Sequence, residues 1–469
     1  MAEKKRLLRI NPMDNVAVAV DDIAKGEHVH GHNLTTRLAG KLEYVWNPEP
    51  AFEWNPKPAF KRNEGGYRFG ADEVEGVIGF PPTFDGYRRR DGSAGIRNEI
   101  WIIPTVGCVN RVAERLAMDA NRLHAGKTDG FFAWPHPYGC SQLGDDHLHT
   151  QLILASLAKH PNAGGVLILG LGCENNNILS FRDILGLSDP ERIRFLETQG
   201  VVDECEAGGI LLAELADFVQ GFRREPIPVS ELVVGLKCGG SDGLSGITAN
   251  PLVGMFSDRL VAAGGTSILT EVPEMFGAET ILMNRCANAG TFDRTVALIN
   301  DFKDYYISHG QVVHENPSPG NRDGGITTLE EKSLGCIQKG GMSPVKDVLV
   351  YGDHVRKTGL NLAQGPGNDI VSVTTLAAAG AHLILFTTGR GTPLGGPVPT
   401  LKIATNDALC VNKPHWIDFN AGRSLMETPE KVTDDLVALV NEIVSGKRRT
   451  RNEENGYREI AIFKNGVTL

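Results

Sequence analysis

Short apolar runs alternate with helical patterns along most of the chain. The apolar run 99–107, "EIWIIPTVG", precedes an amphipathic stretch at 111–123, and the same order recurs from the run 231–240 to the stretch 250–265. Another apolar run of strand length lies at 164–172. Buried strands that alternate with helices are typical of parallel sheets covered by helices. The pattern predicts an α/β fold, with mainly parallel sheets and flanking helices in two subdomains.

The first 90 residues follow a different pattern. Residues 1–45 contain the alternating stretch "DNVAVAVDDIAKGEHVHGHN", which predicts a truncated small β module. Residues 46–90 are rich in Pro, Trp and Asn and predict an extended linker, because proline removes a backbone donor and resists helix formation. With 469 residues, the chain is too long for one ordinary core. We expect the α/β region to divide into a first part at 91–230 and a second part at 231–469.

Charge and hydropathy exclude several classes of protein. The net charge is -10, and clustered positive charge is limited to short pieces such as "GKRRTR" at 446–451, which argues against a nucleic-acid-binding surface. No apolar run approaches the roughly 20 residues that span a bilayer. The basic N-terminus lacks the apolar core of about 7–15 residues that a signal peptide needs. We therefore expect a cytoplasmic protein without nucleic-acid or membrane partners.

The eight cysteines are spread thinly and form no CxxC pair. This distribution predicts reduced thiols rather than a disulfide framework. Half of them adjoin glycine at the end of a predicted strand, namely Cys108, Cys140, Cys173 and Cys238. Thiolates are suitable ligands for iron and zinc, but cysteine also packs as a small hydrophobic residue in tight turns. Both interpretations remain open.

Two groups of histidines are candidates for a metal or substrate site. His28, His30 and His32 alternate, so on a strand they would share one face, although a solvated edge strand would show the same pattern. His147 follows two aspartates at the start of a predicted helix. That segment is equally consistent with an ordinary capped helix N-terminus.

Carboxylates and glycine-rich loops follow other predicted strands. Glu271 and Glu274 could serve as ligands or as acid–base groups, or could complement a helix dipole. The loop 314–335, which contains Lys332, and the loop around Arg390 are rich in glycine, which lets backbone amides approach an anion closely. Neither loop has the P-loop spacing, and the chain lacks a dinucleotide-binding GxGxxG unit. These absences argue against nucleotide binding.

Several of these segments, in this order, resemble the altronate and galactarate dehydratase family of sugar-acid dehydratases. The resemblance runs densely from about residue 91 to the C-terminus, and the end of the chain looks closer to the altronate branch. The segments that carry it are "IWIIPTVGCVN" (100–110), "YGCSQLGDDH" (138–147), "GLGCENN" (170–176), "CGGSDGLSGITANP" (238–251), "TEVPEMFGAE" (270–279), "GPGND" (365–369), "FTTGRGTP" (386–393) and "EIAIFKNGVTL" (459–469).

The resemblance implies a hydro-lyase that converts D-altronate to 2-dehydro-3-deoxy-D-gluconate in hexuronate catabolism, with Fe²⁺ or Mn²⁺ as cofactor. Such a reaction removes a weakly acidic proton beside a carboxylate and expels hydroxide, so it needs a base, an acid and stabilisation of negative charge. Among the strand-end residues we expect catalytic roles for His147, Glu174 and Lys332, substrate binding by Ser241, Asp242, Asn316, Asn321, Arg390 and Thr392, and metal binding by His28, His30, His32, Cys140, Cys173 and Glu274.

The N-terminal segment departs from the family pattern. Family members carry a small SAF-type β module whose two ends resemble "DNVAVA" and "GEHVHGHN", but its middle, with Gly-His-Lys and Lys-Tyr-Gly stretches, is absent here. An internal deletion is the simplest interpretation, and we hypothesise that it impairs turnover.

Other interpretations stay open for the activity and the assembly. The substrate could be galactarate or another sugar acid, the chain could be a related sulfo-lyase, or it could be a metal-binding protein inactivated by the deletion. The alternatives for assembly are a homo-oligomer or association with a separate SAF-module chain.

Overall fold

The computed structural model describes residues 79–313 and 315–466, together with four two-residue strands nearer the N-terminus. These are β1 (Leu7–Leu8), which pairs antiparallel with β2 (Val18–Ala19), and β3 (His28–Val29), which pairs antiparallel with β4 (His32–Asn33). The rest of the expected β module and most of the expected linker lie outside the described residues. The side chains of His28, His30 and His32 lie outside them as well.

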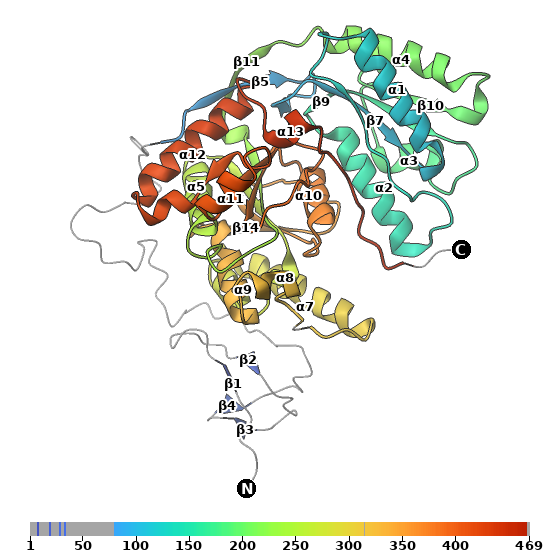
Figure 1. Cartoon of the computed structure of the whole chain (residues 1–469). Helices are drawn as coiled ribbons and strands as arrows, with labels where there is room; N and C mark the ends of the chain where they lie inside the picture. Colours follow the sequence, from blue (N-terminus) through green and yellow to red (C-terminus); the bar gives the residue numbers. More distant parts are fainter. Residues whose placement is uncertain are drawn as a thin grey trace.

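Four parallel strands form the first sheet, in the order β10-β9-β7-β8, and Figure 1 labels three of them, β7, β9 and β10. Their bounds are β7 (Glu99–Pro104), β8 (Phe131–Ala133), β9 (Ala163–Gly170) and β10 (Ile193–Glu197). Strands β7 and β9 correspond to the apolar runs at 99–107 and 164–172. Both are buried along their whole length, as expected for parallel strands covered on both faces.

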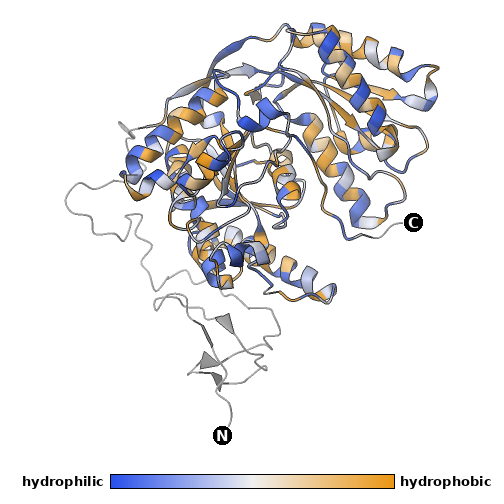
Figure 2. Cartoon of the chain, in the orientation of Figure 1, coloured by the Kyte–Doolittle hydropathy of each residue, from blue (hydrophilic) through white to orange (hydrophobic). Residues whose placement is uncertain are grey.

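Helices cover both faces of the first sheet. Helices α1 (Asn110–Leu123) and α4 (Glu204–Val219) pack on one face, and α2 (Gly144–Lys159), with α3 (Ile178–Leu185) beside it, packs on the other. Figure 2 shows both hydrophilic and hydrophobic residues on the outer helix α1, in keeping with one face on the sheet and one in solvent.

Seven parallel strands form the second sheet, in the order β14-β15-β13-β12-β16-β17-β18. Their bounds are β12 (Val233–Cys238), β13 (Thr266–Leu269), β14 (Val345–Leu349), β15 (Gly359–Ala363), β16 (Leu383–Thr388), β17 (Thr400–Ala404) and β18 (Phe419–Asn420). Helix α5 (Ala249–Ala262) packs on one face of this sheet with α12 (Pro429–Val444) against it, and α10 (Asp369–Ala378) packs on the other face.

Contact between α2 and α10 joins the two sheets into one body. One apolar core, which includes Trp101 of the first sheet and Phe386 of the second, is continuous across this junction. The prediction of an α/β fold with mainly parallel sheets is confirmed.

The remaining elements are shorter or lie at the edges of the sheets. Strands β11 (Arg224–Pro228), β5 (Thr83–Arg88) and β6 (Ala94–Gly95) form an antiparallel sheet, so β5 occupies part of the segment expected as a linker. The other helices are α6 (Glu279–Met283), α7 (Ala289–Ser308), α8 (Pro319–Asp323), α9 (Leu329–Ile337), α11 (Asp407–Asn412) and α13 (Arg451–Asn455). Within the described residues, no helix combines the length and apolar character needed to cross a membrane.

Candidate active site

A group of buried charged and thiol side chains lies at the carboxyl ends of β12 and β13. These two strands are hydrogen-bonded neighbours, so the residues that follow them meet at one edge of the sheet, the usual place for a ligand in α/β folds. Helix α9 and the 3₁₀ turn after it bring further side chains to the same edge. We call this group the lysine–carboxylate cluster, and its members are Lys237, Cys238, Glu271, Glu274, Lys332, Cys336 and Lys339, all buried.

Glu271 pairs with two lysines inside the cluster. Lys339 Nζ lies 2.6 Å from Glu271 Oε2, and Lys237 Nζ contacts Oε1 of the same carboxylate. The backbone N–H of Cys238 donates a further hydrogen bond to Glu271 at 3.0 Å. Lys237 also lies 2.9 Å from Asp369 at the start of α10. The carboxylate of Glu271 is thus held by donors from β12 and from the turn after α9.

Glu274 connects the two thiols to a third lysine. Its Oε2 accepts a hydrogen bond from Cys336 Sγ at 2.8 Å, and it lies 3.1 Å from Cys238 Sγ and 3.1 Å from Lys332 Nζ. The two sulfur atoms are 3.4 Å apart, and Lys339 Nζ lies 2.8 Å from Cys238 Sγ. Each acidic group of the cluster therefore has a buried ammonium group beside it.

The environment moves the pKa values of the two carboxylates in opposite directions. Burial and the neighbouring Cys238 raise the pKa of Glu271 to about 8, against the effect of Lys237 and Lys339. Burial acts in the same direction on Glu274, but three lysines, led by Lys332, hold the pKa of Glu274 at about 2. Pairs of groups whose pKa values are pushed apart in this way are typical of acid–base sites.

The thiols and lysines show complementary pKa shifts. The hydrogen bond with Cys336, supported by Lys332 and Lys339, lowers the pKa of Cys238 to about 5. Burial alone would lower the pKa of Lys332, but Cys238, Cys336 and Glu274 raise it well above its usual value. Lys332 therefore remains charged at neutral pH.

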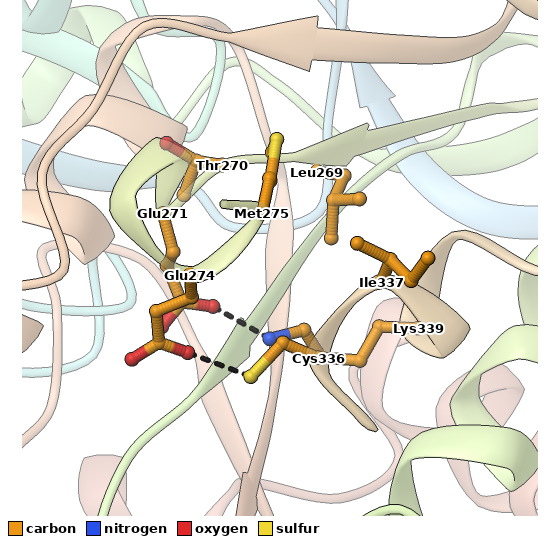
Figure 3. A pocket seen from close by; sticks show the side chains of 8 residues that line it. All are labelled: Leu269, Thr270, Glu271, Glu274, Met275, Cys336, Ile337 and Lys339. Atoms are coloured by element: carbon orange, nitrogen blue, oxygen red, sulfur yellow. Dashed lines mark hydrogen bonds and ion pairs between the residues drawn. The ribbon is translucent and has the colours of Figure 1, made fainter. Parts of the chain in front are cut away.

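A narrow gap, too small to hold a water molecule, lies within this cluster, and Figure 3 shows the side chains that line it. Glu271 and Lys339, and Glu274 and Cys336, face one another across it. Thr270 and the apolar side chains of Leu269, Met275 and Ile337 complete the lining. Charged groups beside apolar walls interact more strongly than they would in water.

Three members of the cluster have the donors for a metal ion. The ligand atoms of Cys238, Glu274 and Cys336 lie within 4.8 Å of one another, and thiolate with carboxylate is a donor set that suits iron. The set fits one ion by donor type and by spacing. Lys332 and Lys339 pair with the same donors, so a bound cation would compete with these two ammonium groups.

Several residues expected from the sequence gather at or near this cluster. Lys332 and Glu274 belong to it, and Lys332 Nζ donates to Ser241 Oγ at 2.9 Å. Asn321 reaches the backbone carbonyl of Ser241 at 3.1 Å, and Arg390 reaches that of Gly320 at 2.7 Å.

The other expected substrate-binding residues lie in nearby loops. Asp242 accepts hydrogen bonds from Thr405 and Asn406, and Thr392 accepts one from the backbone of Leu394. Asn316 is half-buried in the loop before α8. Substrate contact by this set stays a prediction.

The remaining expected residues lie at the edge of the first sheet. His147 is in the first turn of α2, and burial lowers its pKa. Cys140 and Cys173 are exposed in loops there. Glu174 is buried, and its carboxylate accepts hydrogen bonds from Thr105 Oγ1 at 2.7 Å and from two backbone amides. The roles assigned to these four residues stay predictions.

The sequence-based selection missed Lys237, Cys336 and Lys339. Lys332, Cys336 and Lys339 are spaced by four and then three residues, so they share one face of a helix, and this spacing was an available signal. Lys237 interrupts an apolar strand just before Cys238, and a lysine in a fully buried strand is unusual. Cys238 and Glu271 were noted at strand ends, but the sequence alone left their roles open.

Comparison with known proteins identifies the family. Residues 229–468 match the model of the D-galactarate/altronate dehydratase C-terminal domain, and residues 86–220 match that of the D-galactarate dehydratase/altronate hydrolase second domain. The chain is 50% identical to altronate dehydratase of Escherichia coli over 97% of this chain and 88% of the relative. It is 52% identical to altronate dehydratase of Bacillus subtilis, over 96% of this chain and 87% of the relative. It is 36% identical to galactarate dehydratase (L-threo-forming) of E. coli, over 81% of this chain and 76% of the relative. The chain belongs to the D-galactarate/altronate dehydratase family.

Proposed function

We propose that this chain is a hydro-lyase that dehydrates D-altronate to 2-dehydro-3-deoxy-D-gluconate in hexuronate catabolism. Two relatives at about half identity over nearly the whole chain are altronate dehydratases, which favours altronate over galactarate. The observation that carries the proposal is the lysine–carboxylate cluster, because it concentrates three ammonium groups and two carboxylates at a strand edge.

The chemistry of the reaction explains why such a cluster is useful. Removing the proton at C2 of a sugar acid places further negative charge on an existing carboxylate. Buried ammonium groups that are already in position stabilise this charge without reorganisation. We assign this task to Lys332 and Lys339, whose Nζ atoms both contact the cluster's acidic groups.

Substrate positioning is assigned to the neighbouring loops. Ser241, Asn321 and Arg390 are linked to one another and to Lys332 by hydrogen bonds through α8 and the loop after β12. Asp242, Asn316 and Thr392 are proposed to contact the hydroxyl groups of the substrate. Proton transfer by His147 and a supporting role for Glu174 remain part of the proposal.

We propose Fe²⁺ as the cofactor, with Mn²⁺ as the alternative, and Cys238, Glu274 and Cys336 as the residues that would hold it. Bound to the substrate, this ion would act as a Lewis acid. Cys140, Cys173 and the histidines at 28, 30 and 32 remain further candidates for metal binding.

The test is formation of a 2-oxo acid from a panel of substrates by the purified chain, incubated with ferrous iron without oxygen. We expect product from D-altronate, at a higher kcat/KM than from galactarate. Preference for galactarate, another aldonate or sulfolactate would contradict the proposed substrate. Retained iron without any 2-oxo acid would favour the metal-binding alternative.

The internal deletion that we infer in the N-terminal module leads to a separate expectation. If it contributes to the site, turnover should be lower than that of the E. coli relative, and adding the module as a separate chain should raise it. A rate equal to that of the relative would contradict the hypothesis of impaired turnover.

A further inference from the structure

Three cysteines lie at the edge of the first sheet, away from the lysine–carboxylate cluster in sequence. Cys108 follows β7, Cys140 follows β8 and Cys173 follows β9. The three strands are parallel neighbours in the order β9-β7-β8, so their carboxyl ends meet at one edge. All three thiols are free and exposed. We call these residues the thiol triad.

Hydrogen bonds hold the three cysteine loops against one another. The backbone N–H of Gly107 donates to the carbonyl of Tyr138 at 2.8 Å, which joins the first loop to the second. Asn176 joins the third loop to both, because its backbone N–H donates to Gly139 O at 3.0 Å and its side chain donates to Thr105 O at 2.9 Å. The thiol triad is therefore carried by one connected structure rather than by three independent loops.

The residue before each of these cysteines is a glycine. At two of the three positions, the packing explains why a larger residue would not fit. A Cβ on Gly139 would lie 2.0 Å from Thr105 O, and one on Gly107 would lie 2.9 Å from His136 O. Any side chain there would push the loops apart. Gly139 and Gly172 also have φ values of 102° and 128°, which L-residues rarely adopt. The repeated Gly-Cys pairs thus bring the cysteine loops close together.

The thiol triad lies in loops that lead into three helices. Each cysteine precedes a helix, because α1 begins at Asn110, α2 at Gly144 and α3 at Ile178 (Figure 1). Helix N-termini carry partial positive charge and stabilise thiolates and the anions that thiolates bind.

The separation that ligand atoms need distinguishes between kinds of metal centre. Three thiolates around one tetrahedral ion lie about 3.8 Å apart, for metal–sulfur bonds of about 2.3 Å. Among the described residues, the group of three ligand atoms that meets a 4.8 Å limit is Cys238, Glu274 and Cys336, not the triad. This argues against a single ion held by the triad, whereas an iron–sulfur cluster can bind thiolates that lie further apart, because its irons and sulfides separate the protein sulfurs.

We propose that Cys108, Cys140 and Cys173 bind a [4Fe–4S] cluster through three thiolates, which leaves one iron open at the exposed edge. This site is distinct from the proposed ion at Cys238, Glu274 and Cys336. The proposal does not depend on the chain's activity on sugar acids, because cluster binding is read by spectroscopy and composition.

The experiment is anaerobic reconstitution of the full chain with equal amounts of ferrous and ferric iron and with sulfide, followed by removal of unbound ions. These reagents supply the two Fe²⁺, two Fe³⁺ and four S²⁻ of a [4Fe–4S]²⁺ cluster without a further oxidant. We expect a broad visible absorption from sulfide-to-iron charge transfer, together with ~4 iron and ~4 acid-labile sulfide per chain. The serine variants Cys108→Ser, Cys140→Ser and Cys173→Ser should each lose most of the absorption and of the sulfide. Circular dichroism verifies that these exposed substitutions leave the fold intact.

Cys286→Ser and Cys410→Ser are the controls, because both cysteines are free and lie in the part of the chain that carries the second sheet: Cys286 forms a β-bridge with Val345 of β14, and Cys410 lies in α11. They should bind the cluster as the wild type does. The proposal is overturned if the triad variants keep the cluster, if the control variants lose it equally, or if the wild type takes up iron without sulfide. None of these outcomes decides whether altronate is dehydrated.

Discussion

At the scale of single residues, buried charge is the feature that most separates the functional site from the core. Lys237, Lys332 and Lys339 are buried, and each has an acidic partner. Isolated buried ions are strongly unfavourable, so such partners are required for these lysines to stay charged. A functional role for Lys332 and Glu274 could be predicted from the sequence, because Lys332 lies in a glycine-rich loop and Glu274 follows a predicted strand. Their direct contact at 3.1 Å could not, because α9 and β13 are distant in the chain.

Lys402 of β17 is a buried lysine whose ammonium group forms no hydrogen bond with an acidic side chain in the described part of the chain. It is fully buried, its Nζ has no hydrogen-bond partner among the described residues, and it lies 3.7 Å from the Phe386 ring centroid. Burial lowers the pKa of Lys402 from 10.5 to about 7. Between these values the unfolded chain binds a proton that the folded protein has lost. The free energy of unfolding should therefore rise with pH, by at most about 1.4 kcal/mol per unit.

Lys402→Met should remove this part of the pH dependence and raise the free energy of unfolding at pH 7. Urea unfolding of both proteins between pH 7 and pH 10 measures the difference. Lys447→Met, at an exposed lysine, is the control and should keep the wild-type slope. Parallel slopes for wild type and Lys402→Met would show that Lys402 stays protonated in the folded protein.

At the scale of elements, hydrophobic periodicity located the strands and helices well. The apolar runs at 99–107, 164–172 and 231–240 correspond to strands β7, β9 and β12, and the helical stretch at 250–265 corresponds to α5. Each of these segments buries a continuous apolar surface, which sequence periodicity reports directly. The order of strands in the second sheet depends on pairing between distant segments, so periodicity could not supply it. That order is what places Cys238 beside Glu271.

Helix α5 also positions the cluster through one close contact. A Cβ on Gly254 would lie 2.2 Å from the backbone oxygen of Gln338, next to Lys339. Gly254→Ala should therefore displace the turn that carries Lys339, lower kcat/KM, and cost about 1–3 kcal/mol of stability.

Gly209→Ala in α4 is the matched control, since nothing lies within 4 Å of the added Cβ. Alanine at an unhindered helix position should stabilise the protein by about 0.5–1 kcal/mol and leave activity unchanged. Thermal unfolding and steady-state kinetics of both variants provide the measurement. Equal stability of the two variants would refute the role given to the α5 contact.

At the scale of the whole molecule, the end of the chain returns to the start of the first sheet. Arg97, just before β7, donates to Glu453 of α13 at 2.7 and 3.0 Å, and both side chains are only 3% exposed. Burial opposes ionisation of Glu453, but Arg97 and Arg458 hold its pKa at about 2. Its unfolded value is 4.5, so this stabilisation is complete above about pH 4.5 and is lost as pH falls toward 2.

Arg97→Met should cost about 3–5 kcal/mol at pH 7, because it leaves the buried Glu453 without its main partner. The loss of stability from pH 5 to pH 3 should be smaller in the variant than in the wild type. Arg111→Met, at a 91% exposed side chain, should change stability by less than about 0.5 kcal/mol. Urea unfolding at each pH compares the three proteins, and an equal cost for both variants would argue against this link between the ends of the chain.

The most direct test of the central claim is the effect of Lys332→Met on conversion of D-altronate to 2-oxo acid. Lys303→Met is the control, because Lys303 forms another buried pair, 3.0 Å from Glu279, outside the cluster. We predict that kcat/KM falls by about 100-fold or more in Lys332→Met, and by less than about tenfold in Lys303→Met, where only structure is perturbed. Wild-type kcat/KM in Lys332→Met, or an equal fall in both variants, would contradict the assignment of the lysine–carboxylate cluster as the active site.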